Sequence, residues 1–373
     1  MKTVIQVLPL LLCFLSFQSS TAFFVPQAFH KKTTSKITTT AHYTSTTSDI
    51  ATTPPPQVQR IHNNFEWTNP VSKKSHSINY KVEGKVTDPP LLLIHGFGAN
   101  VNHFRYNFPA LVGAGYRVYA VDLLGFGASD KPKEEEYCIE LWVDLLCDFV
   151  TQMNNEQLVE NEQKQQEQRR WVLAGNSIGG LCSLGVAARM QDMIRGVTLF
   201  NCAGGMTSFR YDELPFLLRP ILYFVQKVIL APDGYGGKFF SDFKTRENVE
   251  AILKKQGVYG DVTNVDEELL EILLGPSEDD GAKEVFLKVF GGPAGPTPES
   301  LLRQIESPIL ALWGSDDPWT PVDTGLHPGR DFVKYTKGKF DLRILDGAGH
   351  CPHDECPEKI HQEMIPWLKS LPL

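Results

Sequence analysis

The chain has 373 residues, of which 42% are hydrophobic, so it can bury a substantial core and is not disordered along its whole length. Its formal net charge of −8 provides no broad positive field, which disfavours nucleic acid as a partner. We expect one large folded domain with an insertion.

Residues 1–22 have the pattern of a secretory signal peptide. Lys2 precedes an apolar run at residues 4–17, and the small residues at 20–22 (Ser-Thr-Ala) suit signal peptidase. The run is shorter than the roughly 20 apolar residues that a membrane-spanning helix needs. We therefore predict a cleaved signal peptide rather than a retained anchor.

Residues 23–59 are rich in Ser and Thr and carry basic residues but almost no acidic ones. This composition is typical of a transit peptide, and its place behind a signal peptide resembles the bipartite leaders of algae whose plastids lie inside additional membranes. The alternative is a secreted protein with a disordered Ser/Thr-rich stalk, because composition alone does not separate the two. We expect a plastid protein.

Short apolar runs typical of strands recur along the rest of the chain, with helical patterns such as those at 140–153 and 179–190 between them. Strands are predicted at residues 65–68, 77–83, 91–94, 116–121, 171–174, 196–200, 309–313 and 341–345. Such alternation indicates an α/β fold with a mainly parallel sheet that helices cover on both faces.

Two segments depart from this alternation. Residues 154–170 are almost entirely polar and rich in Gln and Glu, so we predict a solvated surface insertion there. Residues 202–305 include an apolar helical face at 221–229 and are predicted to form a mostly helical cap. The core then consists of two parts, residues 60–201 and 306–373.

The sequence Gly175-Asn176-Ser177-Ile178-Gly179 follows a predicted strand and leads into a predicted helix, which is the setting of a nucleophile elbow. In this sharp turn Gly175 and Gly179 avoid crowding by Cβ atoms, so Ser177 projects its hydroxyl oxygen into the active site. The pattern alone is weak because it arises by chance, but its context is specific. Ser177 is the predicted nucleophile.

A serine hydroxyl is a poor nucleophile near neutral pH, so it needs a base and a third group that orients the base. His350 follows the last predicted strand in Gly-Ala-Gly-His, where a loop can carry its imidazole back over the sheet. We predict that His350 is the base, while a structural loop histidine is the alternative. His353 is a weaker candidate that we expect to support the loop. No third ligand accompanies the two histidines, so no metal is predicted.

The orienting acid is expected after a strand that lies between the nucleophile and the base in the chain. Asp316 and Asp317 both follow the strand predicted at 309–313. We choose Asp317 because a turn of several residues is needed to reach the base, and Asp316 remains the alternative. The other suitable strand end holds Asn201, which carries no charge to stabilise an imidazolium.

The tetrahedral intermediate of acyl transfer needs hydrogen-bond donors for its oxyanion. We predict the backbone amides of Phe97, in a Gly-containing loop after the strand at 91–94, and of Ile178, directly after the nucleophile. For His95 we favour a structural role in the same loop over proton transfer, and we expect Asp122 to shape its own loop.

With these residues, the chain from 65 to 368 resembles capped α/β-hydrolases, and within them the plant and algal chlorophyll dephytylase and pheophytinase group. The resemblance implies an α/β-hydrolase fold, a triad of Ser177, Asp317 and His350, and oxyanion amides from Phe97 and Ile178. The widely shared motifs lie at 95–99, 122–130 and 175–180, and the more selective ones at 201–206, 313–321 and 349–352.

The resemblance implies hydrolysis of a carboxylic ester without a metal or organic cofactor. The expected substrate is the phytyl ester of chlorophyll, with pheophytin or another lipophilic ester as alternatives, and loose association with the thylakoid follows. A receptor that binds a lipophilic ligand without turnover and an acyltransferase are the other interpretations, and a complete triad disfavours the receptor. Ser177 argues against relatives that use an Asp nucleophile. The polar insertion and the algal-type leader depart from the plant pattern.

Overall fold

The computed structural model describes residues 58–158, 170–206 and 234–372. The predicted signal peptide, nearly all of the transit-like segment and the apolar face at 221–229 lie outside the described residues. The last two residues of the transit-like segment are described, and the carbonyl of Gln59 accepts a hydrogen bond from Asn102 at 2.9 Å. The folded part therefore begins slightly before the predicted residue 60.

All eight predicted strands are present, and each coincides with the prediction at one end and differs from it by one or two residues at the other. The strands are β1 (Asn63–Thr68), β2 (Ser75–Glu83), β3 (Pro90–Ile94), β4 (Arg117–Val121), β5 (Trp171–Asn176), β6 (Ile194–Phe200), β7 (Ile309–Gly314) and β8 (Phe340–Leu345). β1 and β2 are amphipathic, whereas β3, β5, β6 and β7 are buried along their whole length. Fully buried strands are typical of a sheet that is covered on both faces.

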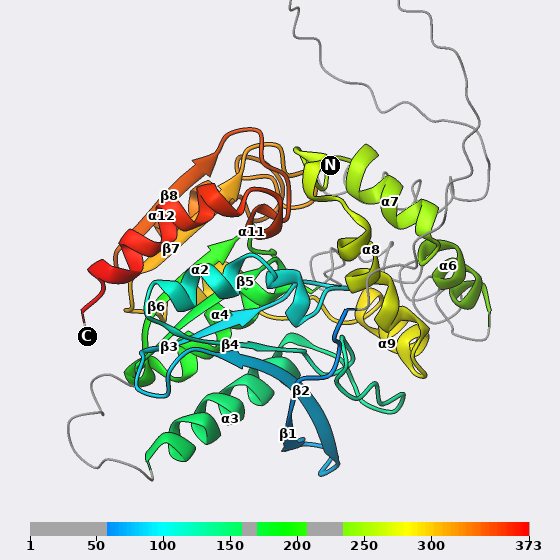
Figure 1. Ribbon diagram of the computed structural model, residues 1–373, viewed down its shortest axis with the longest axis horizontal. Helices are drawn as coiled ribbons and strands as arrows, with labels where there is room; N and C mark the ends of the chain where they lie inside the picture. The colour runs from blue at the N-terminus through cyan, green and yellow to red at the C-terminus, as the bar shows by residue number, and fades with distance from the viewer. Residues whose placement is uncertain (1–57, 159–169, 207–233, 373) are drawn as a thin grey trace, which may run out of the picture. The chain divides into compact units, whose positions relative to one another are not determined.

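The strands form one sheet in the order β1-β2-β4-β3-β5-β6-β7-β8 (Figure 1). The pairs β1–β2 and β2–β4 are antiparallel and all other pairs are parallel, so the prediction of a mainly parallel sheet is confirmed. In the register, Ile94 pairs with Gly175, and Gly175 pairs with Leu199. The carboxyl ends of β3, β5 and β6 therefore lie side by side, and the loops that follow them meet at one edge of the sheet.

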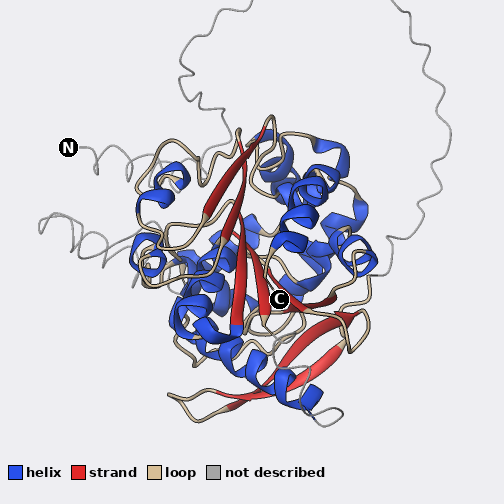
Figure 2. Cartoon of the chain, turned by 90° about the vertical axis from the view of Figure 1, so that its left-hand side faces the viewer, coloured by secondary structure: helices blue, strands red, loops and turns tan. Residues whose placement is uncertain are grey.

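Helices cover both faces of the sheet (Figure 2). Leu92 and Ile94 of β3 pack in the core cluster that contains α3 and α4, whereas Leu91 and Leu93 pack in the cluster that contains α2 and α12. This alternation is the period of two that a strand imposes on its side chains. The helices outside the cap region are α2 (Asn107–Gly113), α3 (Ile139–Leu158), α4 (Ile178–Arg189), α11 (Pro352–Glu355) and α12 (Pro357–Ser370), with 3-10 turns η1 (Val101–Phe104), η3 (Gln191–Met193) and η8 (Gly329–Lys334).

Helix α3 continues to Leu158, so the first five residues of the predicted insertion at 154–170 are helical. Residues 154–158 contain neither Gly nor Pro, and Gln and Glu favour the helix, so nothing stops it at the predicted end. Residues 159–169 lie outside the described part of the chain.

The described parts of the predicted cap are residues 202–206, which form a loop, and 234–305, which contain helices and no strand. α7 and α8 share a small core with Tyr259 and Cys351. Leu302 and Ile305, at the end of the predicted cap, pack by contrast in the main core cluster that contains α4. The elements are α6 (Tyr235–Phe243), α7 (Arg246–Lys255), η6 (Val262–Asn264), α8 (Glu267–Leu274), η7 (Gly275–Glu278), α9 (Ala282–Phe290) and α10 (Pro298–Leu302).

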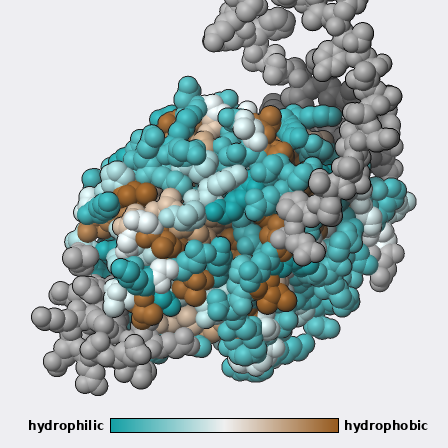
Figure 3. All heavy atoms as spheres, viewed as in Figure 1, coloured by the Kyte–Doolittle hydropathy of each residue, from teal (hydrophilic) through white to brown (hydrophobic). Residues whose placement is uncertain are grey.

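Among the described residues, no helix has both the length and the apolar character that crossing a membrane requires. On the face shown in Figure 3, hydrophobic residues form small separate groups among hydrophilic ones.

Candidate active site

Ser177 lies in a sharp turn between β5 and α4. Its φ of 56° and ψ of −120° place it in a region that few residues other than Gly adopt, and it is the residue before the first turn of α4. A Cβ on Gly175 would approach the Gly179 carbonyl oxygen to 2.2 Å, and one on Gly179 would approach the Ile94 oxygen equally closely. The two glycines are therefore required by packing, and the strained turn has the geometry of a nucleophile elbow.

The loop after β3 packs directly on this turn. A Cβ on Gly96 would lie 2.9 Å from the side-chain oxygen of Asn176 and 3.2 Å from the Cβ of Ser177. The backbone N–H groups of Phe97 and Ile178 donate no hydrogen bond within the described residues. Two amides without an acceptor thus lie close to Ser177, as an oxyanion-binding site requires.

His350 and Asp317 form a buried pair. The His350 Nδ1–H donates to the Asp317 Oδ2 at 2.8 Å, and the two side chains are almost completely shielded from solvent. The other carboxylate oxygen, Oδ1, accepts the backbone N–H groups of Trp319 and Thr320 at 2.8 and 3.0 Å. The Thr320 hydroxyl donates to Oδ2 at 2.5 Å. The carboxylate is thus held in one orientation relative to the imidazole.

The surroundings of Asp317 keep it ionised. Burial by itself would raise the pKa of this carboxyl, but the charge and hydrogen bond of His350, together with the hydrogen bonds of Thr320, lower the pKa well below its usual range. A carboxylate that accepts the Nδ1–H of His350 leaves Nε2 of the neutral ring as the acceptor of a proton. This is the arrangement of a general base with its orienting acid.

The structure also distinguishes the two neighbouring aspartates. The Asp316 side chain is exposed and accepts a hydrogen bond from the hydroxyl of Ser315 at 2.7 Å. Asp317 instead points into the site toward His350.

Ser177 and His350 meet at the same edge of the sheet. The side-chain amide of Asn176 donates to the backbone oxygen of His350 at 2.9 Å and to that of Phe200 at 3.2 Å, so the turn is tied to the histidine loop. The hydroxyl of Ser177 makes no hydrogen bond with His350 in this structure or with any other described residue. The structure therefore brings all three predicted residues together and joins two of them by a hydrogen bond.

Asn201 is a site residue that the sequence analysis missed. Its Nδ2 donates to the Asp317 Oδ2 at 2.5 Å, while its Oδ1 accepts the Gly314 N–H at 3.1 Å. Its φ of 47° is positive, and its side chain is fully buried. We discarded Asn201 because it carries no charge, but a neutral donor is what the carboxylate needs. The available signal was its position at the end of a buried strand in one of the selective motifs.

The other polar residues singled out in the sequence have structural contacts. His95 donates from Nδ1 to the Gly96 oxygen at 2.7 Å and accepts the Leu123 N–H on Nε2 at 3.0 Å, and burial lowers its pKa. Asp122 accepts backbone N–H groups from two loops. His353 is buried against the rings of Phe104 and Phe200. Within the described ranges no three such side chains are grouped to hold a metal ion.

Comparisons with known proteins place this geometry in context. Residues 91–363 match the model of the family described as "Alpha/beta hydrolase family". Lipase 3 of Moraxella sp. (strain TA144) is 31% identical over 306 residues, which cover 79% of this chain and 82% of that protein. The chloroplastic pheophytinase of Arabidopsis thaliana is 24% identical over 352 residues, 83% of this chain and 66% of that protein. The chain thus spans slightly less than two thirds of the Arabidopsis relative.

Solved structures agree on the fold. A thermophilic esterase from Thermogutta terrifontis superposes with a TM-score of 0.59 at 20% identity, covering 83% of this chain and 98% of the esterase. A serine hydrolase involved in carbazole degradation superposes with a TM-score of 0.57 at 21% identity, covering 82% and 99% of the two chains. At this level of identity the likeness concerns the fold.

Proposed function

Since this chain belongs to the alpha/beta hydrolase family, we propose that it is a serine esterase that cleaves a lipophilic carboxylic ester with Ser177, His350 and Asp317 as its triad. The observation that carries this proposal is the hydrogen bond between His350 and Asp317, beside the strained turn of Ser177. A receptor without turnover is not proposed, because hydrolases and lipases are among the relatives that this chain matches.

The first half of the reaction forms an acyl-enzyme. The Ser177 oxygen attacks the ester carbonyl carbon while the proton of its hydroxyl passes to Nε2 of His350. Asp317 stabilises the imidazolium, and the amides of Phe97 and Ile178 donate to the negative carbonyl oxygen. When this intermediate collapses, the bond to the alcohol breaks and His350 returns the proton to the departing alkoxide oxygen.

The second half releases the acid. A water molecule gives a proton to His350 and attacks the acyl carbon, and the same two amides stabilise the new oxyanion. The bond to the Ser177 oxygen then breaks, and His350 returns the proton to that oxygen. The carboxylic acid leaves and the starting state is restored, so no metal ion or organic cofactor takes part in the proposed cycle.

We further propose the phytyl ester of chlorophyll as the substrate, with pheophytin and other lipophilic esters as alternatives. The match to a pheophytinase and the motifs at 201–206 and 349–352 support this choice. The surroundings of the site are also aromatic: the ring of Phe97 lies 5.2 Å from that of Phe286 in α9, and Phe286 contacts a cluster of cap rings. Trp319, 53% exposed, lies 5.0 Å from the His350 ring. Aromatic side chains close to the catalytic residues suit an apolar ester.

The substrate proposal predicts the release of phytol when the purified protein is incubated with chlorophyll, because Ser177 forms an acyl-enzyme only by expelling the alcohol. Phytol is quantified by chromatography, with chlorophyllide as the matching product, and the Ser177→Ala variant serves as the control for spontaneous cleavage. Release from pheophytin alone would favour the first alternative. Turnover of short-chain esters without phytol from either pigment would contradict the phytyl-ester proposal and leave a general esterase.

We also propose import into a plastid, followed by loose association with the thylakoid. The proposal rests on the apolar run at 4–17 and the basic, Ser/Thr-rich segment behind it. A fluorescent protein fused behind residues 1–60 is expected to accumulate in the plastid of an alga with such a leader. A fusion behind residues 1–22 is the matched control, and we expect it to remain in the secretory pathway. Secretion of both fusions would contradict the plastid proposal.

A further inference from the structure

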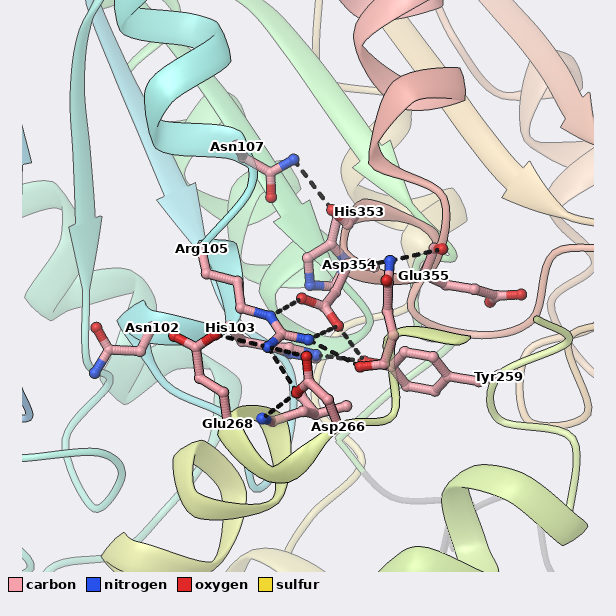
Figure 4. Close-up of polar contacts among 12 residues, drawn as sticks. Asn102, His103, Arg105, Asn107, Tyr259, Asp266, Glu268, His353, Asp354 and Glu355 are labelled. Carbon is pink, nitrogen blue, oxygen red and sulfur yellow. Dashed lines mark hydrogen bonds and ion pairs between the residues drawn. The ribbon is translucent and has the colours of Figure 1, made fainter. Parts of the chain in front are cut away.

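Arg105, at the end of η1, lies at a junction of three parts of the fold (Figure 4). Its guanidinium donates to Asp354 in α11, with 2.9 Å between Nε and Oδ1. It also donates to Asp266 and Glu268 at the start of the cap helix α8, at 2.8 and 3.0 Å, and to the carbonyl oxygen of Asn264 at 2.9 Å. One side chain thus connects the loop after β3, the cap and the helix that follows His350.

A second chain of hydrogen bonds reaches the same carboxylate. The Tyr259 hydroxyl donates to the Asp354 Oδ2 at 3.0 Å and lies 2.9 Å from the His103 Nε2. Burial lowers the pKa of His103 to about 4, so the ring is neutral and its Nε2–H donates to Tyr259, while Nδ1 has no hydrogen-bond partner among the described residues. The ring of His353 packs against the ring of His103, with 4.6 Å between the two ring centroids.

The cap segment that ends at Asp266 contacts the histidine loop through main-chain atoms. The His350 N–H donates to the Val258 oxygen at 2.7 Å. The Glu355 carboxylate accepts the Gly349 N–H at 2.8 Å and the Asp261 N–H at 2.7 Å, so it bridges the loop and the cap. A Cβ on Gly349 would approach the Val258 oxygen to 2.3 Å. Because the two backbones touch, a shift of the cap segment is passed to His350.

Asp354 depends on Arg105 for its charge balance. The Asp354 side chain is fully buried and that of Arg105 is 8% exposed, whereas Asp266 and Glu268 are about half exposed. Removing one partner of a buried pair leaves an uncompensated charge, and the surroundings then rearrange. A lysine keeps the positive charge but lacks the planar fork that reaches several acceptors at once.

We propose that Arg105 is a positioning residue for His350, which it orients by holding the cap segment 257–266 and α11 against the loop of the histidine. The inference rests on the role of His350 proposed above. Tyr259 completes the junction, since its hydroxyl joins the cap to Asp354. Neither residue is proposed to touch the ester.

Kinetics with p-nitrophenyl acetate test this role, because so small an ester reports on the base rather than on the fit of the cap. For Arg105→Lys we expect kcat to fall by about tenfold to a hundredfold, the range that a small misplacement of a catalytic group produces, with KM within about twofold. The rate at which a small phosphonate labels Ser177 is expected to fall in proportion. Tyr259→Phe removes a single oxygen atom and is expected to lower both rates less, in the same direction.

Arg246→Lys is the matched control, because Arg246 pairs with Glu267 within the cap on an exposed surface. Its kcat is expected to equal that of the wild type. The inference is overturned if Arg105→Lys folds and retains the wild-type kcat. If that variant does not fold, the inference is overturned when Tyr259→Phe retains the wild-type kcat and labelling rate. The His350→Ala variant distinguishes failure of the proposed triad from failure of the Arg105 inference. If this variant stays active, the proposed triad is wrong. If it is inactive, the Arg105→Lys result tests the positioning role by itself.

Discussion

Replacement of Ser177 by Ala is expected to lower kcat/KM for ester hydrolysis by about 10⁴-fold or more, because no acyl-enzyme forms without the hydroxyl oxygen. The fold is expected to persist. The Ser177 side chain caps no backbone group of α4, and alanine carries the same Cβ in the strained turn. Hydrolysis of a p-nitrophenyl ester measures the loss, and circular dichroism together with the thermal midpoint verifies the fold.

The double variant Ser177→Ala, His350→Ala makes this test sharper. Residues that act as one catalytic unit do not contribute independently, so the double variant is expected to lose little more than either single one. Losses that multiply would indicate that the two residues act separately and would count against the triad. Rescue of the single His350→Ala variant by added imidazole would agree with its role as base.

Replacement of Asp317 by Asn is expected to lower kcat by roughly 10⁴-fold, as loss of the orienting acid does in other triads. Both carboxylate oxygens of Asp317 accept hydrogen bonds. Oδ1 accepts two backbone N–H groups, and Oδ2 accepts hydrogen bonds from Asn201, Thr320 and His350. An asparagine must point its NH₂ group at one of these sets. If it faces His350, Nδ1 has to accept and the proton moves to Nε2, which then cannot take the proton of Ser177.

Asp316→Asn is the control in the same turn, with the same change of charge. The Asp316 side chain is exposed and outside the hydrogen-bond network of His350, so its kcat is expected to stay within about twofold of the wild type. Both variants are compared by kcat on one ester at the same pH. A larger loss for Asp316→Asn than for Asp317→Asn would transfer the orienting role to Asp316.

Much of the fold and the main site residues could be predicted from the sequence. The runs at 91–94, 171–174, 196–200 and 309–313 carried the strand signal because a strand buried on both faces must be apolar at every position. The elbow was equally readable, since a strained turn packed against a neighbouring backbone leaves room for glycine alone at positions 175 and 179. These signals are local, and the chain order of nucleophile, acid and base follows once the strand ends are known.

The contacts that complete the site were decided by the tertiary structure. Asn201 meets Asp317 across 116 residues of sequence, and Arg105 meets Asp354 across 249. Neither pair leaves a local pattern, because each depends on which strands become neighbours and on where the loops at their carboxyl ends turn. Asp316 and Asp317 cannot be told apart in the sequence, because the direction of the loop after β7 determines which of the two carboxylates faces His350. The sequence by itself determined the strands, the elbow and the candidate base, while packing of distant loops decided which polar groups surround the Asp317 carboxylate.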